Sequence, residues 1–183
     1  LSLIWQAGGT PFTTDGDTVK IDFSDENTQK ALDFWQKMID EDLITNDIGN
    51  WSDDWNRALN DGTLATQVIG GWMTANLPPR APDAAGNFRV AAMPQWNEGE
   101  NYSAENGGST LAILEASEQK EAAFKFVEYI THGDGVQPRV DSNATVPNLS
   151  ILENEDSLAA TDDYYGGQQV NQVIADVAAN VRT

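Results

Sequence analysis

The chain has 183 residues, 40% of them hydrophobic, which suits one core or one lobe of a larger protein but not two large domains. Ten basic against 29 acidic side chains give a formal net charge of −19, which would repel nucleic-acid phosphates and anionic membranes. No apolar run approaches the roughly 18 residues of a membrane-spanning helix. The absence of cysteine excludes disulfides and thiolate metal ligands.

Several stretches are predicted to be extended. Asp15-Gly16 is typical of a tight turn, and the alternating apolar residues after it, over 19–23, predict a hairpin. Short apolar runs bounded by glycine, proline or polar loops predict strands at residues 64–69, 88–92 and 110–114.

Apolar residues at three- and four-residue spacing predict helices between these extended segments. The first helix is capped by Ser24 or Asp25, and its stripe, which includes Trp35, is expected to be buried. A short helix follows Ser52 or Asp53 and ends at Asp61-Gly62. A second short helix follows Trp72 and is closed by Pro78-Pro79. Two longer helices are expected from Ser117 to His132-Gly133, with a buried face at Ala122, Ala123, Phe126, Val127 and Ile130, and after Gly166-Gly167 through Val181.

The residue types needed for several common chemistries are missing or wrongly spaced. His132 is the only histidine, which argues against a histidine triad or a zinc site. The acidic turns at residues 15–17 and 22–26 do not fit a calcium loop, and the glycine pairs do not form a phosphate loop. We therefore expect no catalytic residue, no metal and no cofactor. A glycoside hydrolase remains an alternative because two carboxylates suffice for that reaction.

Helices and extended segments interleave throughout, which indicates an α/β or α+β class. Eight segments in this order resemble the extracellular solute-binding proteins of bacterial carbohydrate ABC importers, of the maltose-binding-protein type (family 1). They are residues 7–9 (AGG), 34–39 (FWQKMI), 58–66 (ALNDGTLAT), 70–72 (GGW), 92–94 (AMP), 106–109 (NGGS), 122–127 (AAFKFV) and 165–168 (YGGQ).

The resemblance implies an α/β, periplasmic-binding-protein-like type II fold, in which two lobes close around a sugar by a hinge motion. Residues 1–107 and 150–183 would belong to the carboxyl-terminal lobe, and residues 108–149 would cross toward the amino-terminal lobe. The chain is then expected to be a fragment truncated at both ends, with any export signal upstream.

A sugar pocket needs flat aromatic rings for C–H faces and amide or hydroxyl groups for the hydroxyl edges. By resemblance, Trp72 forms the floor for a sugar ring, and Asn106, Gly107 and Gly108 form a loop facing the cleft. Tyr165 and Gln168 belong to a second cleft segment, where the tyrosine can stack and the glutamine can hydrogen-bond. The alternatives are a core tryptophan, a flexible polar turn and a tyrosine packed at a helix start. Trp5, Gln6 and Trp51 are weaker candidates.

The predicted function is capture of a sugar or oligosaccharide outside the cell and its delivery to the permease subunits of an ABC importer. The protein is expected to be a monomer, either periplasmic or tethered as a lipoprotein, that binds no nucleic acid and breaks no bond. The alternative from another class is a carbohydrate-active hydrolase or an accessory carbohydrate-binding domain.

Overall fold

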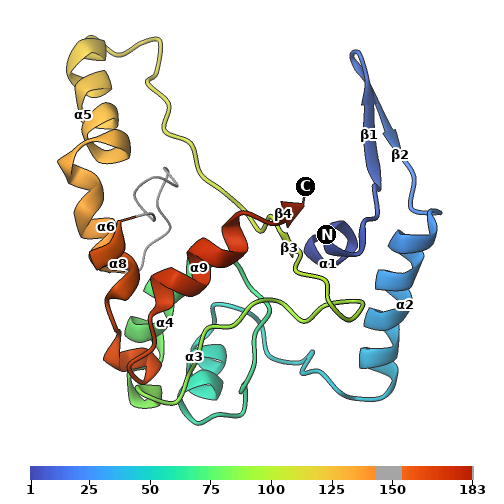
Figure 1. Ribbon diagram of the computed structural model, residues 1–183. Coiled ribbons are helices and arrows are strands. Elements are labelled where there is room, and N and C mark those ends of the chain that lie inside the picture. Colours follow the sequence, from blue (N-terminus) through green and yellow to red (C-terminus); the bar gives the residue numbers. More distant parts are fainter. Residues whose placement is uncertain (143–153, 183) are drawn as a thin grey trace. The chain divides into compact units, whose positions relative to one another are not determined.

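The computed structural model describes residues 1–142 and 154–182, which form two compact units (Figure 1). The first unit comprises Leu1–Val68, Ala92–Asn106 and Val177–Thr183, and the second comprises Ile69–Ala91 and Gly107–Asp176. Both units are therefore assembled from segments that are distant in sequence. The predicted lobe boundaries at residues 107 and 149 refer to a longer two-lobed protein and stay a prediction.

The first unit begins with two helices packed on each other, α1 (Ser2–Ala7) and α2 (Glu26–Asp40). Gly8 ends α1 in the left-handed conformation with φ 88°, which glycine adopts without strain. Asp25 begins α2, and its carboxylate accepts a hydrogen bond from the Thr28 backbone N–H. The predicted helix and one of its two proposed caps are confirmed.

Four short strands of the first unit form two pairs. The hairpin pairs β1 (Phe12–Asp15) with β2 (Thr18–Ile21), which confirms the predicted hairpin. Because Asp15 pairs with Thr18, the turn residues are Gly16 and Asp17, one position later than predicted. The second pair is parallel and joins β3 (Ser103–Ala104) to β4 (Val181–Arg182).

A third helix of the first unit, α3 (Asp53–Asn60), matches its prediction closely. The Ser52 hydroxyl caps it by accepting from the Trp55 backbone N–H at 3.1 Å. Trp55 and Leu59 lie on its buried face, with 2% and 0% of their surface exposed. This short helix is therefore fixed at one end by its cap and along one face by apolar burial.

The second unit contains α4 (Met73–Arg80), the 3-10 turn Pro82–Ala84, α5 (Lys120–His132) and the 3-10 turn Asp134–Val136. It continues with α6 (Gln137–Asp141), α8 (Glu155–Ala159), the 3-10 turn Asp163–Tyr165 and most of α9 (Val170–Ala178). Its core gathers around the buried face of α4, namely Met73, Thr74 and Leu77, and includes Ala81, Ala84, Tyr165 and Val170.

The end of α4 differs from the prediction that Pro78-Pro79 closes this helix. The helix continues through both prolines to Arg80. Proline lacks the N–H that would bond to the carbonyl four residues earlier, which for Pro78 is the Thr74 carbonyl. In this fold the Tyr165 hydroxyl donates to that carbonyl at 2.8 Å, so a side chain from a distant segment supplies the missing donor.

The three other predicted strands, at 64–69, 88–92 and 110–114, do not form within the described residues. A strand requires a neighbouring backbone to accept and donate its hydrogen bonds. For residues 88–92 that role is taken by a side chain, because the Gln168 amide bonds to both backbone groups of Val90. Val181, predicted to end the last helix, instead lies in β4.

Two predicted buried faces are exposed. Trp35, expected in the core, is 46% exposed, and the buried residues of α2 are Thr28 and Ala31, nearer its start. The whole of α5 lacks a buried residue, and Phe126 on its predicted inner face is 61% exposed. An apolar stripe is buried only where another element covers it, and within the described residues little covers these two.

Candidate ligand-binding site

Trp72 lies directly before the first turn of α4, in the second unit. Its ring is half-buried, and its backbone carbonyl accepts a hydrogen bond from the Asn76 amide at 2.9 Å. Gly71 before it packs against α9, since a Cβ at this position would lie 3.9 Å from the Ile174 side chain. The tryptophan is thus held at a defined helix start, with part of its ring accessible.

Gly107 lies beside this tryptophan. A Cβ on Gly107 would be 3.8 Å from the Trp72 indole nitrogen, so the two predicted site residues are brought together. The φ angle of Gly107 is 87°, a conformation that costs a residue with a side chain about 1–2 kcal/mol. Gly108, which follows it, is exposed. Trp72 and Gly107 therefore bring an indole ring and accessible backbone groups together.

Tyr165 also comes close to α4, but its ring is covered. The side chain is 2% exposed, packs edge-to-face on Tyr164 at 5.1 Å, and donates its hydroxyl to the Thr74 carbonyl. Burial raises the pKa of both phenols above their usual value, so both hydroxyls stay protonated donors near neutral pH. This geometry matches the alternative of a tyrosine packed at a helix start.

Gln168 uses both the oxygen and the nitrogen of its side-chain amide within the protein. The side-chain oxygen accepts from the Val90 N–H at 2.8 Å, and the side-chain nitrogen donates to the Val90 carbonyl at 2.7 Å. This pattern imitates the pairing of a neighbouring strand. Gln168 therefore anchors residues 88–92 in this structure, and its contact with a ligand stays a prediction.

In the first unit, Gln6 is 2% exposed and its amide nitrogen donates to the Pro94 carbonyl at 2.8 Å and the Tyr102 carbonyl at 3.2 Å. Its side-chain oxygen is buried without a hydrogen-bond partner. The neighbouring Trp5 is half-buried. Gln6 thus ties α1 to residues 94–102, which is a structural connection.

Trp51 is 47% exposed, with a backbone φ of 68°, and its ring lies 4.9 Å from the Trp55 ring. A half-exposed indole supported from below by a buried one is a suitable surface for a sugar ring. Asn106, at the end of the first unit's middle segment, is also exposed. Both remain predicted contacts.

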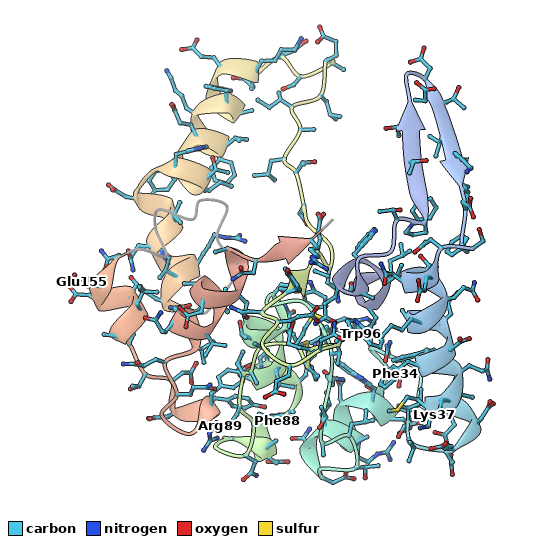
Figure 2. The ribbon with its side chains drawn as sticks, turned by 45° about the vertical axis from the view of Figure 1, so that its right-hand side comes forward. Phe34, Lys37, Phe88, Arg89, Trp96 and Glu155 are labelled. Carbon is cyan, nitrogen blue, oxygen red and sulfur yellow. The ribbon has the colours of Figure 1, made fainter. Side chains whose placement is uncertain are left out.

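Sequence reasoning missed a second aromatic group of the first unit. Figure 2 shows Phe34 pointing toward Trp96, and the two rings meet edge-to-face at 5.4 Å. Lys30 lies over the Trp96 ring at 5.1 Å, and Arg182 covers the Tyr102 ring at 3.3 Å. These contacts join residues 60 to 80 positions apart, so no local sequence pattern predicts them.

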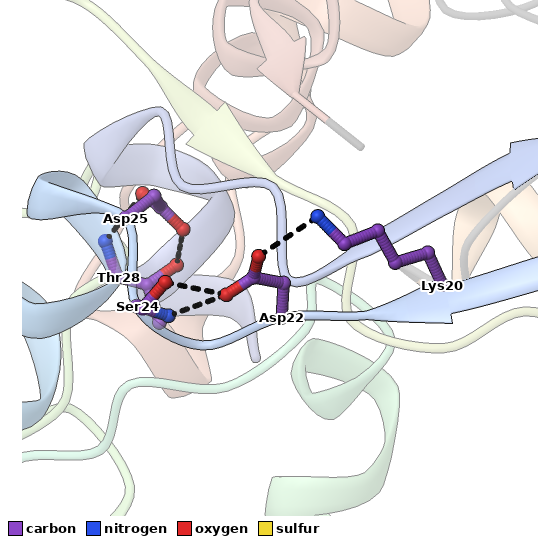
Figure 3. A network of polar contacts seen from close by, with 5 residues as sticks. All are labelled: Lys20, Asp22, Ser24, Asp25 and Thr28. Atoms are coloured by element: carbon purple, nitrogen blue, oxygen red, sulfur yellow. Dashed lines mark hydrogen bonds and ion pairs between the residues drawn. The ribbon is translucent and has the colours of Figure 1, made fainter.

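The second acidic turn, at residues 22–26, is occupied by contacts within the chain, as Figure 3 shows. Asp22 accepts from the Ser24 hydroxyl at 2.6 Å and its N–H at 3.0 Å, and it pairs with Lys20 at 3.0 Å. The Ser24 hydroxyl, its N–H and Lys20 together lower the pKa of Asp22. In the part of the chain that the structure describes, no group of three or more His, Cys, Asp or Glu side chains could hold a metal ion.

A hollow of about 570 Å³ lies elsewhere in the second unit, between α6 and α8. Among the described residues, its lining includes the four carboxylates Asp141, Asp156, Asp162 and Asp163 and no aromatic ring. A sugar would find hydrogen-bond acceptors there but no flat apolar platform. The surface at Trp72 and Gly107 is therefore the better candidate within this unit.

The profile of the family described as bacterial extracellular solute-binding protein matches residues 1–134. The chain belongs to this family. The predicted resemblance and fold class are thus confirmed, and the mixed helices and strands are those of one part of a solute-binding protein. Among the described residues, no helix has the length and apolar character to cross a membrane.

Similar proteins bind sugars. The ABC transporter associated binding protein from B. animalis subsp. lactis Bl-04, solved with beta-1,6-galactobiose, is 42% identical with a TM-score of 0.90 and covers 100% of this chain. A lactose-binding protein of Rhizobium radiobacter is 28% identical over 96% of the chain. An arabinooligosaccharide-binding protein of Halalkalibacterium halodurans is 22% identical over 88%. The chain spans only 47%, 42% and 40% of these three proteins, less than half of each.

Proposed function

We propose that the protein carrying this chain captures a short oligosaccharide and passes it to an ABC importer. The observation that carries the proposal is the 42% identity and 0.90 TM-score to a transporter-associated protein that holds beta-1,6-galactobiose. Lactose is also a galactosyl disaccharide, and it names a relative that is 28% identical to this chain. We therefore take galactosyl disaccharides as the first ligands to test.

The proposed platform for the sugar is Trp72 with the backbone of Gly107 and Gly108. A half-buried indole can stack on the C–H face of a sugar, and a glycine beside it leaves the approach open. Tyr165 and Gln168, in the same unit, are kept as further proposed members of this site, either as contacts or as supports. Asn106, Trp5, Gln6 and Trp51, in the first unit, are kept separately as proposed sugar contacts.

The longer protein is proposed to have a second lobe that completes the cleft, with residues 108–149 crossing toward it. Support comes from Leu114 and Phe126 in this segment, which are 74% and 61% exposed. Large apolar side chains exposed along one segment are typical of an interface that is covered in a longer protein. We further propose that the protein lies outside the cell, periplasmic or lipid-anchored, as a monomer that meets the permease subunits.

The test measures binding of beta-1,6-galactobiose to the full-length protein by titration calorimetry, with lactose and an arabinooligosaccharide as comparison ligands. Trp72→Ala is expected to weaken binding about tenfold or more, because a stacking surface is lost. Trp35→Ala is the control, since it removes another accessible tryptophan, one that lies on α2 in the first unit and outside the proposed site. Equal affinity of the two variants would contradict the placement of the site.

The same samples separate binding from hydrolysis. After incubation, chromatography of the sugar is expected to recover intact disaccharide, which is the result for a transporter subunit. Release of free galactose would support the hydrolase alternative instead. A full-length protein that neither binds nor cleaves any of the three sugars would overturn the proposed function.

A further inference from the structure

Tyr165 closes a gap in the hydrogen bonding of α4, at the turn that carries Trp72. Pro78 has no N–H to give to the Thr74 carbonyl. The Tyr165 hydroxyl donates there at 2.8 Å, from a ring that is 2% exposed. Trp72 lies two residues before Thr74, so this bond acts on the first turn of the helix.

Tyr164 makes the corresponding bond at the other end of α4. Its hydroxyl donates to the Ala81 carbonyl at 2.8 Å, just past the last residue of the helix. Its own backbone carbonyl accepts from Gly86 at 2.8 Å. Two adjacent tyrosines therefore hold the two ends of one helix, and only one of them acts near the tryptophan.

We propose that Tyr165 is a positioning residue for Trp72, setting the first turn of α4 through the Thr74 carbonyl that Pro78 leaves without its usual donor. This inference rests on the proposed function and reassigns Tyr165 from ligand contact to support. If the first turn loosens, Trp72 occupies its binding position for a smaller fraction of time, and the apparent affinity falls by that fraction.

The test compares Tyr165→Phe with Tyr164→Phe in the full-length protein. Each variant keeps its ring and loses one hydroxyl that bonds a backbone carbonyl. Tyr164→Phe therefore controls for the general destabilisation that Tyr165→Phe also causes. Tyr165→Phe is expected to weaken binding of beta-1,6-galactobiose about fivefold, the equivalent of one hydrogen bond. Tyr164→Phe is expected to change it less than twofold.

The double variant Tyr165→Phe with Pro78→Ala tests the cause. Alanine restores a backbone N–H at position 78, which can donate to the Thr74 carbonyl within the helix. We expect the affinity to return to within about twofold of the wild type. Failure of the rescue, or an equal loss of affinity in the two tyrosine variants, would overturn the positioning role.

A readout without ligand separates this inference from the proposed function. Hydrogen exchange of the amides at residues 73–76 is expected to speed up in Tyr165→Phe and not in Tyr164→Phe. If the wild type binds no sugar, the proposed function fails. Hydrogen exchange would still show whether Tyr165 orders the first turn of α4. Unchanged exchange in Tyr165→Phe would refute the inference even in a sugar-binding protein.

Discussion

Gln168 offers the sharpest test of how this fold holds its irregular segments. Its side chain makes two hydrogen bonds to the backbone of Val90, at 2.8 and 2.7 Å, across 78 residues of sequence. Each bond contributes about 0.5–1.5 kcal/mol net. Because Val90 is half-buried and water can partly replace the lost amide, we expect Gln168→Ala to lower the free energy of unfolding by about 1–2 kcal/mol.

Gln168→Glu tests the direction of the two bonds. A carboxylate can still accept from the Val90 N–H, but it faces the Val90 carbonyl without a proton to donate. At neutral pH the loss of stability is expected to be at least as large as that of Gln168→Ala. Facing a carbonyl raises the pKa of this carboxyl group in the folded state, so as the pH falls toward about 4.3, the ordinary pKa of glutamic acid, protonation restores a donor and the stability difference from the wild type should narrow.

The assay combines urea unfolding with hydrogen exchange at the Val90 amide, which reports the bond directly. Gln172→Ala is the matched control, since its exposed amide bonds only to Asp176 one turn along α9, and a cost of about 0.2–0.5 kcal/mol is expected. The anchoring role would be refuted if Gln168→Ala left the exchange rate of the Val90 amide unchanged and had the same stability as Gln172→Ala. Reduced sugar affinity at unchanged stability would instead make Gln168 a ligand contact.

Three further changes test the first unit. Gly9→Ala puts a Cβ 2.5 Å from the Thr28 hydroxyl and 2.7 Å from an Ile4 methyl group, so the free energy of unfolding, measured by thermal unfolding, is expected to fall by about 1–3 kcal/mol. Gly49→Ala is the control and should cost almost nothing, because a Cβ there would meet open space. Trp55→Ala in the core is expected to cost about 3–5 kcal/mol in urea unfolding, and the exposed Trp51→Ala far less. Hydrogen bonds to the Asp25 side chain lower its pKa, so its cap stabilises above the unfolded value of about 3.9 and is lost as pH falls below it. Asp25→Asn keeps a capping side chain without the charge, so its unfolding curves should not show this loss of stability at low pH. Identical pH profiles of stability for Asp25→Asn and the wild type would contradict the role of the Asp25 charge.

Several local elements of this chain follow from the sequence by itself. Asp25 and Ser52 cap the helices that they precede, whereas α1 and the left-handed glycine that ends it are not among the predicted elements. The hairpin forms around Gly16, one residue from where it was predicted. Caps and turns are hydrogen bonds between residues two to four positions apart, so composition and spacing are enough to predict them.

Only the tertiary structure decided the rest, because it depends on contacts between residues far apart in sequence. Nothing near Pro78 indicates that the Tyr165 hydroxyl, 91 residues after Thr74 in sequence, donates to the Thr74 carbonyl in place of the N–H that the proline lacks. The sequence therefore predicts that the two prolines close the helix, whereas the helix includes both and ends at Arg80. Residues 88–92 have the composition of a strand but pair with a glutamine side chain. The helix α2 is amphipathic, yet Trp35 can be buried only if another surface covers the apolar face. An apolar pattern indicates which face of a helix can be buried, and it does not indicate which element covers that face.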